Sequence, residues 1–357
     1  MTKQQISTPA LLLDLDAFES NLARMATAAK HAGKKLRPHA KAHKCVEIAR
    51  RQMAAGACGL CVATVSEAEI LAQAGIDGLL LTSPLADPLK IARIVATGAM
   101  VVVDHLRQVE WYQQAARAAN AQIAVLVDLD VGDHRTGAPS LEQALDLALA
   151  IDQASHLWLR GVQAYSVGAS HATDCDERKC ISTEAFNLAA EARDTMAHHG
   201  LHTDIVSGGS TGTCDIDLAI PHVTEIQAGS YALMDLAYRN AEVDFRNALT
   251  VLTTVVSANH NDFVTVDGGF KAFSTDRPFG PEPVGVDGPA AYRWAGDEFG
   301  CVDIRDCTTR PRLGSRIEFI PPHCDPTVNL YDRIYVCRGD RVEDVWPVMD
   351  RVNSGRS

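Results

Sequence analysis

A run of basic residues early in the chain contains a side chain that could bond covalently to a ligand. The run reads RPHAKAHK over residues 37–44, with Lys41 near its middle. A lysine held in a partly desolvated site has a lowered pKa, and its amine then attacks carbonyl groups. The same run is also compatible with a solvated basic turn on the surface.

Two later segments carry side chains suited to ligand binding and proton transfer. DLDVGDHRTG, residues 128–137, places Arg135 in a turn rich in Gly and Asp. There it could bind a ligand oxygen or pair with a neighbouring carboxylate. Tyr165 begins the segment YSVGASH, which ends at His171. Histidine titrates near neutral pH and could act as an acid or base, or could simply bond the backbone of its loop.

Two further segments combine glycines with hydroxyl groups: SGGSTGT at 207–213 and QAGSY at 227–231. Glycines let backbone N–H groups approach phosphate oxygens, and hydroxyl groups add donors. The GK[ST] ending of a nucleotide-binding P-loop is missing from both. The pair predicts a phosphate site, with purely structural turns as the alternative.

The segment PPHCDPT, residues 321–327, offers a pair of metal-binding side chains. His323 and Asp325 are two residues apart, so in an extended segment they point to the same side. Imidazole and carboxylate suit Mn²⁺, Zn²⁺ or Mg²⁺, whereas the thiolate of Cys324 would favour Zn²⁺. A loop histidine that binds no metal is the alternative.

The elements between these segments predict the architecture. Short apolar runs alternate with helical patterns over the first two thirds of the chain, and apolar runs of this kind are typical of parallel strands buried on both faces. Eight repeats predict an α/β fold, a (β/α)8 TIM barrel, with an open doubly wound sheet as the competing architecture. The expected strands are Lys35–His39, Gly59–Ala63, Gly78–Thr82, Met100–Asp104, Ile123–Asp128, Leu159–Tyr165, Thr203–Ser207 and Glu225–Gly229.

A barrel would gather the segments described above, because the carboxyl ends of its strands build the site. The lysine run follows the first expected strand, and the Arg135 turn follows the fifth. The two glycine-rich segments follow the seventh and eighth, where barrels often bind phosphate.

The sequence changes character after about residue 240. Strand-like segments such as DFVTVDGG and RIEFIPP alternate with turns rich in Gly and Pro, without a long helical pattern. We therefore predict a barrel at 16–240 and a C-terminal antiparallel β domain at 241–357 that carries the metal pair. The strand-like run ALLLDLD begins at residue 10 and could pair with either domain. We expect the N-terminal strand within residues 1–15 to join the β domain.

Composition limits the partners and the compartment. Of 357 residues, 33 are basic and 45 acidic, giving a net charge of −12, which argues against a nucleic-acid or anionic membrane surface. The chain contains no apolar run of the roughly 20 residues that a membrane helix needs. Ten scattered cysteines and an N-terminus unlike a signal peptide predict a reduced, cytoplasmic protein.

Six segments, in one order from about residue 8 to residue 332, resemble the fold-type III pyridoxal-phosphate (PLP) enzymes. Within them, the chain is similar to the group of D-threonine aldolase, 3-hydroxy-D-aspartate aldolase and D-serine dehydratase, whose barrel is like that of alanine racemase. The segments are TPALLLDLDAFESNL, LRPHAKAHK, SGGSTGT, EIQAGSYALMD, DGGFKAFSTD and PPHCDPTVNLYD.

The resemblance implies roles for particular side chains. Lys41 would bind the aldehyde carbon of PLP, Arg135 would meet its phenolate oxygen, and Tyr165 would lie beside its ring. His171 would reach toward the substrate and act in catalysis. The two glycine-rich segments would bind the cofactor, mainly at its phosphate, through Ser207, Gly208, Gly209, Thr211, Gly229, Ser230 and Tyr231.

The resemblance also implies a metal and a reaction. His323 and Asp325 would bind a divalent metal, with Mn²⁺ expected and Mg²⁺ or Zn²⁺ as alternatives. Dehydratases of the group resemble His-x-Cys and aldolases His-x-Asp, and this chain has the aldolase register, although Cys324 lies between the two ligands. The implied reaction is retro-aldol cleavage of a D-3-hydroxy amino acid, D-threonine giving glycine and acetaldehyde.

Other activities stay open. A 3-hydroxy-D-aspartate aldolase and a D-serine or D-threo-3-hydroxyaspartate dehydratase are the alternatives within the group. An amino-acid racemase and a non-catalytic PLP carrier are less favoured. The family's dimers complete the active site across the subunit interface, so a homodimer is expected.

Overall fold

Two compact units make up the computed structural model of the chain, which describes residues 1–349. The barrel unit comprises residues 24–41 and 46–229. The β unit comprises residues 1–23, 42–45 and the described chain from residue 230 onward. Residues 350–357 of the predicted β domain lie outside the described residues.

Eight parallel strands form the barrel unit's sheet, in the order β2-β9-β8-β7-β6-β5-β4-β3. A parallel bridge between His39 and Cys61 joins the two strands at the ends of this order. There the N–H groups of Cys58 and Cys61 also donate to the carbonyls of Leu36 and Pro38, each at 2.9 Å. The sheet is therefore closed, and the predicted (β/α)8 barrel is confirmed over an open sheet. The strands are β2 (Lys35–Leu36), β3 (Cys61–Val62), β4 (Leu80–Leu81), β5 (Met100–Val103), β6 (Ile123–Asp128), β7 (Leu157–Ala164), β8 (Ile205–Gly208) and β9 (Glu225–Ile226).

The strands form where the sequence is apolar because both of their faces are covered. One set of fully buried side chains comes from five different strands and packs together: Cys61, Leu80, Val102, Leu126 and Ile205. Such layers fill the interior of a barrel, so that it is a packed core rather than a channel.

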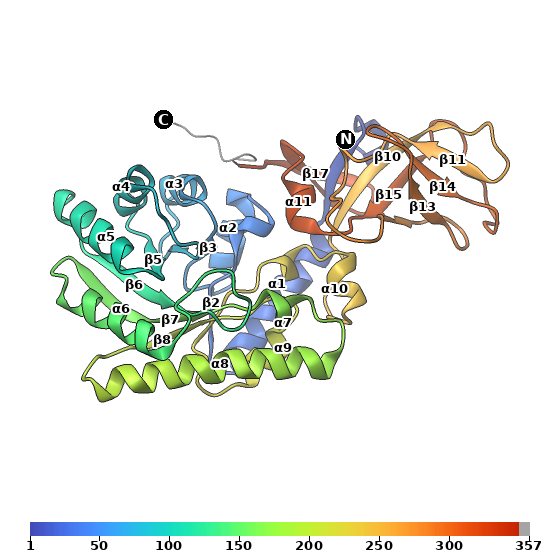
Figure 1. Cartoon of the computed structure of the whole chain (residues 1–357). Helices are drawn as coiled ribbons and strands as arrows, with labels where there is room; N and C mark the ends of the chain where they lie inside the picture. Colours follow the sequence, from blue (N-terminus) through green and yellow to red (C-terminus); the bar gives the residue numbers. More distant parts are fainter. Residues whose placement is uncertain (350–357) are drawn as a thin grey trace. The chain divides into compact units, whose positions relative to one another are not determined.

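Helices lie outside these strands (Figure 1). Several begin at a side chain that accepts a hydrogen bond from the first turn: Thr64 from the N–H of Glu67, and Ser140 from the N–H of Gln143. The helices are α2 (Val46–Ala54), α3 (Val65–Gln73), α4 (Pro88–Ala96), α5 (Leu106–Ala118), α6 (Leu141–Gln153), α7 (Val167–His171), α8 (Cys175–His198) and α9 (Cys214–Ala219). Helix α1 (Leu15–His31) begins in the β unit and ends in the barrel unit.

A nine-stranded, mostly antiparallel sheet forms the β unit. Its main path is β13-β14-β11-β10-β1-β16-β17, and β15 pairs with β10 and β12. Strand β1 is antiparallel to β10 and parallel to β16. The elements are β1 (Ala10–Asp14), α10 (Leu236–Asn240), β10 (Leu249–Ser257), β11 (Phe263–Val266), β12 (Glu282–Val284), β13 (Ala291–Trp294), β14 (Gly300–Asp303), β15 (Arg316–Ile320), α11 (Cys324–Val328), β16 (Arg333–Arg338) and β17 (Arg341–Pro347).

Strand β1 takes part in the core of the β unit. Ala10 and Leu12 on this strand pack with Ile6, Leu252 and Cys337 in one buried cluster.

Among residues 1–349, no helix is long and apolar enough to cross a membrane.

Candidate active site

Lys41 lies on a short turn at the carboxyl end of β2. The chain leaves the strand at Leu36 and forms a 3-10 turn at Ala40–Ala42. The N–H of Lys41 donates to Nδ1 of His39 at 3.4 Å, and Nε2 of that histidine lies 3.0 Å from Thr82 Oγ1. Arg37 and His39 are buried and Lys41 is half-buried, so the run is not a solvated surface turn.

A buried ion pair supports the chain just before this turn. Arg37 Nε donates to Glu225 Oε2 at 2.9 Å, and its Nη2 donates to Oε1 at 2.8 Å. Arg37 also donates to the carbonyl of Gly78. Burial opposes the charge on Arg37, but the hydrogen bonds and charge of Glu225 outweigh that effect, and the pKa of Arg37 is raised.

The loop that carries Arg135 is held by two carboxylates from the strand ends. Asp128 Oδ2 accepts a hydrogen bond from Thr136 Oγ1 at 3.0 Å, and Asp104 Oδ2 accepts one from the Gly137 N–H at 3.1 Å. Asp128 Oδ1 also accepts one from Gln163 Nε2 at 2.8 Å. Burial raises the pKa of Asp128 to about 6 despite these donors. The exposed Arg135 is thus presented by a fixed loop.

The Arg135 loop is joined to the segment after β7. The Asp133 carboxylate accepts hydrogen bonds from the N–H of Val167, from the N–H of Gly168 at 3.1 Å and from Ser166 Oγ at 3.2 Å. The three donors lie at the beginning of helix α7, which ends at the half-buried His171. The guanidinium carbon of Arg135 lies 5.3 Å from the centre of the Tyr165 ring. The structure therefore brings Arg135 and Tyr165 together.

The glycine-rich segment after β8 leaves no room for side chains at two positions. A Cβ on Gly208 would lie 1.9 Å from the carbonyl oxygen of Ala164. Gly209 has φ +76°, and a Cβ there would lie 2.2 Å from Asp217 Oδ2. Ser207 and Thr211 in the same segment are fully buried. The result is a loop of backbone and hydroxyl groups, the surface that suits a phosphate.

The segment after β9 starts beside the glycine-rich one, because β8 and β9 are paired neighbours. The Gln227 N–H donates to the Gly208 carbonyl at 2.8 Å, and Gln227 Nε2 donates to Ser207 Oγ at 3.0 Å. Gly229 ends the barrel unit. Ser230 and Tyr231 follow in a 3-10 turn that belongs to the β unit, and both are buried there.

The predicted metal pair lies in the β unit, at the start of α11. His323 Nδ1 lies 2.7 Å from Asp276 Oδ2, and Asp325 Oδ1 accepts a hydrogen bond from Ser230 Oγ at 3.2 Å. A carboxylate on Nδ1 is the contact that commonly orients a metal-binding histidine, with Nε2 as its ligand atom. Within residues 1–349, no three or more His, Cys, Asp or Glu side chains are grouped as a metal site. The segment is helical from Cys324 onward, so the prediction of an extended segment with both side chains on one side is wrong. Imidazole and carboxylate are nevertheless donors of the kind that divalent metals bind together with water or substrate.

Cys324 is fully buried between the two predicted ligands. Its N–H donates to Asp235 Oδ2 at 2.8 Å, and its thiol donates to Asp325 Oδ1 at 3.3 Å. Burial raises the pKa of this thiol well above its ordinary range. Cys324 is thus held by two carboxylates, Asp235 at its backbone and Asp325 at its thiol.

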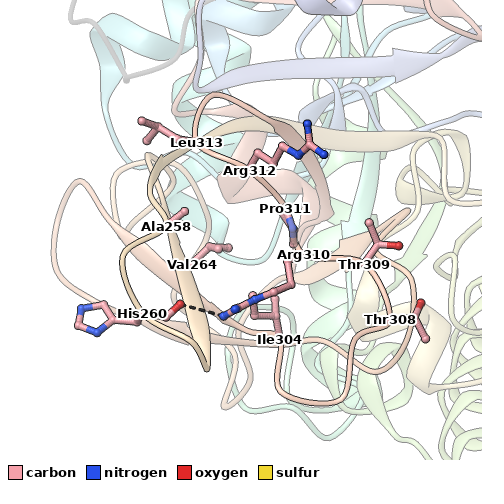
Figure 2. A pocket seen from close by; sticks show the side chains of 10 residues that line it. All are labelled: Ala258, His260, Val264, Ile304, Thr308, Thr309, Arg310, Pro311, Arg312 and Leu313. Atoms are coloured by element: carbon pink, nitrogen blue, oxygen red, sulfur yellow. Dashed lines mark hydrogen bonds between the residues drawn. The ribbon is translucent and has the colours of Figure 1, made fainter.

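Three loop arginines that could contact a substrate carboxylate lie in different surroundings. Arg239 pairs with Glu282, with Nη1 to Oε1 at 2.8 Å. Arg310 lines a cavity of about 580 Å³ in the β unit and donates to the His260 carbonyl at 3.0 Å (Figure 2). Arg277 Nη2 lies 3.5 Å from His323 Nδ1. Only Arg277, of these three, contacts a predicted site residue.

Sequence reasoning missed the residues that hold the site in place. They are Asp104, Asp128, Asp133, Gln163, Asp217, Gln227 and Asp276. Asp128 and Asp133 lie inside the segment selected for Arg135, and Gln227 lies inside the second glycine-rich segment. The available signal was that Asp is common where a turn must satisfy backbone N–H groups.

Comparison with known proteins identifies the family. Residues 13–236 match the family described as alanine racemase, N-terminal domain, and residues 248–337 match a serine dehydratase domain. This chain belongs to the fold-type III PLP enzymes. The barrel unit fits that cofactor, because it combines a half-buried lysine on a fixed turn with a glycine cradle and buried hydroxyl groups.

Several aldolases are similar to this fold-type III chain over nearly its full length. It is 39% identical to a D-threonine aldolase from Arthrobacter sp, over 97% of this chain and 93% of the relative. It is 35% identical to a 3-hydroxy-D-aspartate aldolase from Paracoccus denitrificans, over 98% and 94%. The crystal structure of a D-threonine aldolase from Filomicrobium marinum superposes with a TM-score of 0.95 at 36% identity, covering 98% of this chain and 97% of that one.

Proposed function

We propose that this protein is a PLP- and divalent-metal-dependent aldolase that cleaves D-3-hydroxy amino acids, with D-threonine giving glycine and acetaldehyde. The observation that carries the proposal is the half-buried Lys41 on its turn at the carboxyl end of β2, in a chain similar to aldolases from end to end. The substrate is a small D-amino acid, and neither nucleic acid nor membrane is a partner.

The cofactor would be held by residues at the carboxyl ends of the barrel strands. Lys41 would bind its aldehyde carbon, Arg135 its phenolate oxygen, and Tyr165 would flank its ring. Its phosphate would be bound by the glycine-rich segments, through Ser207, Gly208, Gly209, Thr211, Gly229, Ser230 and Tyr231. Once bound, PLP supplies a ring that accepts the electron pair released when a bond to Cα breaks.

His171 is the proposed general base. It accepts the proton of the substrate's β-hydroxyl oxygen, so that a carbon–oxygen double bond forms as the Cα–Cβ bond breaks. His323 and Asp325 would hold the metal, with Mn²⁺ expected and Mg²⁺ or Zn²⁺ as alternatives. A metal there supplies Lewis-acid polarisation of the hydroxyl group.

One assay with two variants tests the lysine and the reaction. The purified protein should show the visible-edge absorbance of a lysine-bound PLP, and Lys41→Ala should abolish it. Lys44→Ala is the matched control, because Lys44 belongs to the same basic run and should keep the absorbance. D-threonine with Mn²⁺ should give glycine and acetaldehyde.

Other products or conditions would contradict the aldolase assignment. Ammonia and a keto acid would identify a dehydratase. Undiminished turnover in EDTA with racemised amino acid would identify a racemase, and bound PLP without any turnover would identify a carrier.

A 3-hydroxy-D-aspartate aldolase is the second candidate, and Arg277 favours it. Its guanidinium contacts His323, so it could bind the second carboxylate of such a substrate. Arg277→Met should then lower kcat/KM for D-3-hydroxyaspartate by about 100-fold, the effect of losing a charge-assisted pair, and leave that for D-threonine nearly unchanged. Equal losses for both substrates would exclude this role.

We also propose a homodimer in the cytoplasm. All ten cysteines lie among residues 1–349 and none of them forms a disulfide there, which fits a reducing compartment. Light scattering coupled to size-exclusion chromatography should give twice the chain mass of 38.4 kDa, and a monomer mass would refute the dimer.

A further inference from the structure

Asp217 is a fully buried carboxylate directly behind the glycine-rich segment, and the proposed chemistry does not use it. Its Oδ1 accepts a hydrogen bond from Ser182 Oγ on helix α8 at 2.5 Å. Its Oδ2 accepts one from Thr213 Oγ1, also at 2.5 Å. Both carboxylate oxygens are therefore engaged, one by a helix and one by the segment itself.

The hydrogen bonds continue from Thr213 along the segment. Thr213 Oγ1 accepts from the Ser210 N–H at 3.0 Å and lies 3.1 Å from Ser210 Oγ. The Ser210 N–H also acts to lower the pKa of the Asp217 carboxyl, against the larger effect of burial. The turn formed by residues 210–213 is thus held in place, through Thr213, by the side chain of Asp217.

The Asp217 carboxylate also packs against the backbone of Gly209. Its φ of +76° lies in the left-handed region, and Asp217 Oδ2 occupies the place that a Cβ would need, only 2.2 Å away. The glycine and the aspartate therefore fit each other, and together they determine the direction of the backbone as it leaves β8.

A buried carboxylate is costly, and burial raises the pKa of Asp217 to about 7. An apolar residue of similar size would fill this space with a smaller desolvation cost. The contribution of Asp217 is therefore the hydrogen bonds that it accepts. They maintain the conformation of the segment that holds the predicted phosphate-binding residues Gly208, Gly209 and Thr211.

We propose that Asp217 is a positioning residue for the cofactor phosphate, acting through the backbone of the glycine-rich segment rather than by contact with the cofactor. This inference rests on the proposed function, since it assumes that the segment binds the phosphate of PLP. It predicts that loss of Asp217 weakens binding of the phosphate and leaves the reaction of the aldehyde with Lys41 unaffected.

Comparison of PLP with pyridoxal, which lacks the phosphate, tests this. The full-length protein is freed of cofactor and titrated with each compound, and the dissociation constants are taken from the visible absorbance. Asp217→Asn replaces one of the two acceptor oxygens by an NH2 group, and it should raise the dissociation constant for PLP by about tenfold, the value of one hydrogen bond lost inside the protein. The constant for pyridoxal should change little. Asp215→Asn is the control, because Asp215 is exposed on the same helix and its loss removes the same charge.

Ser182→Ala is a second variant that keeps the carboxylate and removes only its donor on helix α8. It should raise the PLP constant in the same direction by a smaller factor, and it answers the question if Asp217→Asn does not fold. Unchanged PLP binding in the variants, or equal losses for PLP and pyridoxal, would overturn the inference. A wild-type protein that binds no PLP would instead refute the proposed function.

Discussion

Breaking the buried Arg37–Glu225 ion pair should lower the free energy of unfolding by much more than breaking an ion pair at the surface. It joins β9 to the chain leaving β2, and the two residues are 188 positions apart. Both side chains are almost completely buried, and they share two hydrogen bonds of 2.9 and 2.8 Å. Glu225→Gln keeps the shape but removes the charge, which leaves the Arg37 guanidinium buried without its counter-ion.

The expected cost follows from this burial. Removing one partner of a buried ion pair costs about 3–5 kcal/mol of unfolding free energy. The chain offers a matched pair at its surface, Arg160 and Asp204, with hydrogen bonds of 3.0 and 2.7 Å. There the side chains are 21% and 47% exposed, and Asp204→Asn should cost about 0–1 kcal/mol.

Urea unfolding followed by far-UV circular dichroism measures both costs, because that signal is dominated by the helices of the barrel unit. Glu225→Gln should lower the midpoint clearly more than Asp204→Asn, with an unchanged slope against urea. Equal shifts, or a loss below about 1 kcal/mol for Glu225→Gln, would refute the reasoning from burial.

Three further predictions follow from contacts of single carboxylates. Asp133→Asn should lower kcat by about tenfold, because it loosens the helix that carries His171. PLP affinity should stay unchanged, because Asp104 and Asp128 still hold the Arg135 loop and the phosphate segments are not touched; a loss of PLP affinity would contradict this. Burial raises the pKa of Asp128 to about 6, so the stability it contributes is present at low pH and is lost as pH rises from about 4 to 6. The unfolding free energy of Asp128→Asn relative to wild type should therefore increase by about 3 kcal/mol across that window, and a constant difference would exclude the shift. Asp276→Asn should weaken Mn²⁺ binding by about 10- to 100-fold in a calorimetric titration, since it removes the carboxylate that orients His323; unchanged affinity would exclude that role.

The barrel could be predicted because its strands are apolar on both faces and therefore appear as short apolar runs. The strand ends were less accurate. The first strand is predicted over Lys35–His39, whereas the continuous strand ends at Leu36 and the pairing goes on only as single contacts up to His39. Residues after a strand could still be placed at its carboxyl end, since that position depends only on the order of elements.

The supporting carboxylates could not be predicted, because a charged residue has the same local pattern whether it is solvated or paired. Arg37 stands in a basic run, and only the fold brings Glu225 to it. Asp217 and Ser182 are 35 residues apart on two helices, and no periodic pattern relates them. Such pairs depend on contacts between distant segments, whereas sequence patterns report on near neighbours.

The position of β1 in its sheet has a consequence for biosynthesis. This apolar strand is made first, yet its partners β10 and β16 begin at residues 249 and 333. An apolar strand with two unpaired edges is prone to aggregate, so it needs protection while the rest of the chain is synthesised. The barrel unit, made in between, can fold before these partners exist. The sheet of the β unit is therefore completed only after β16 has been synthesised, when the whole of the barrel unit already exists.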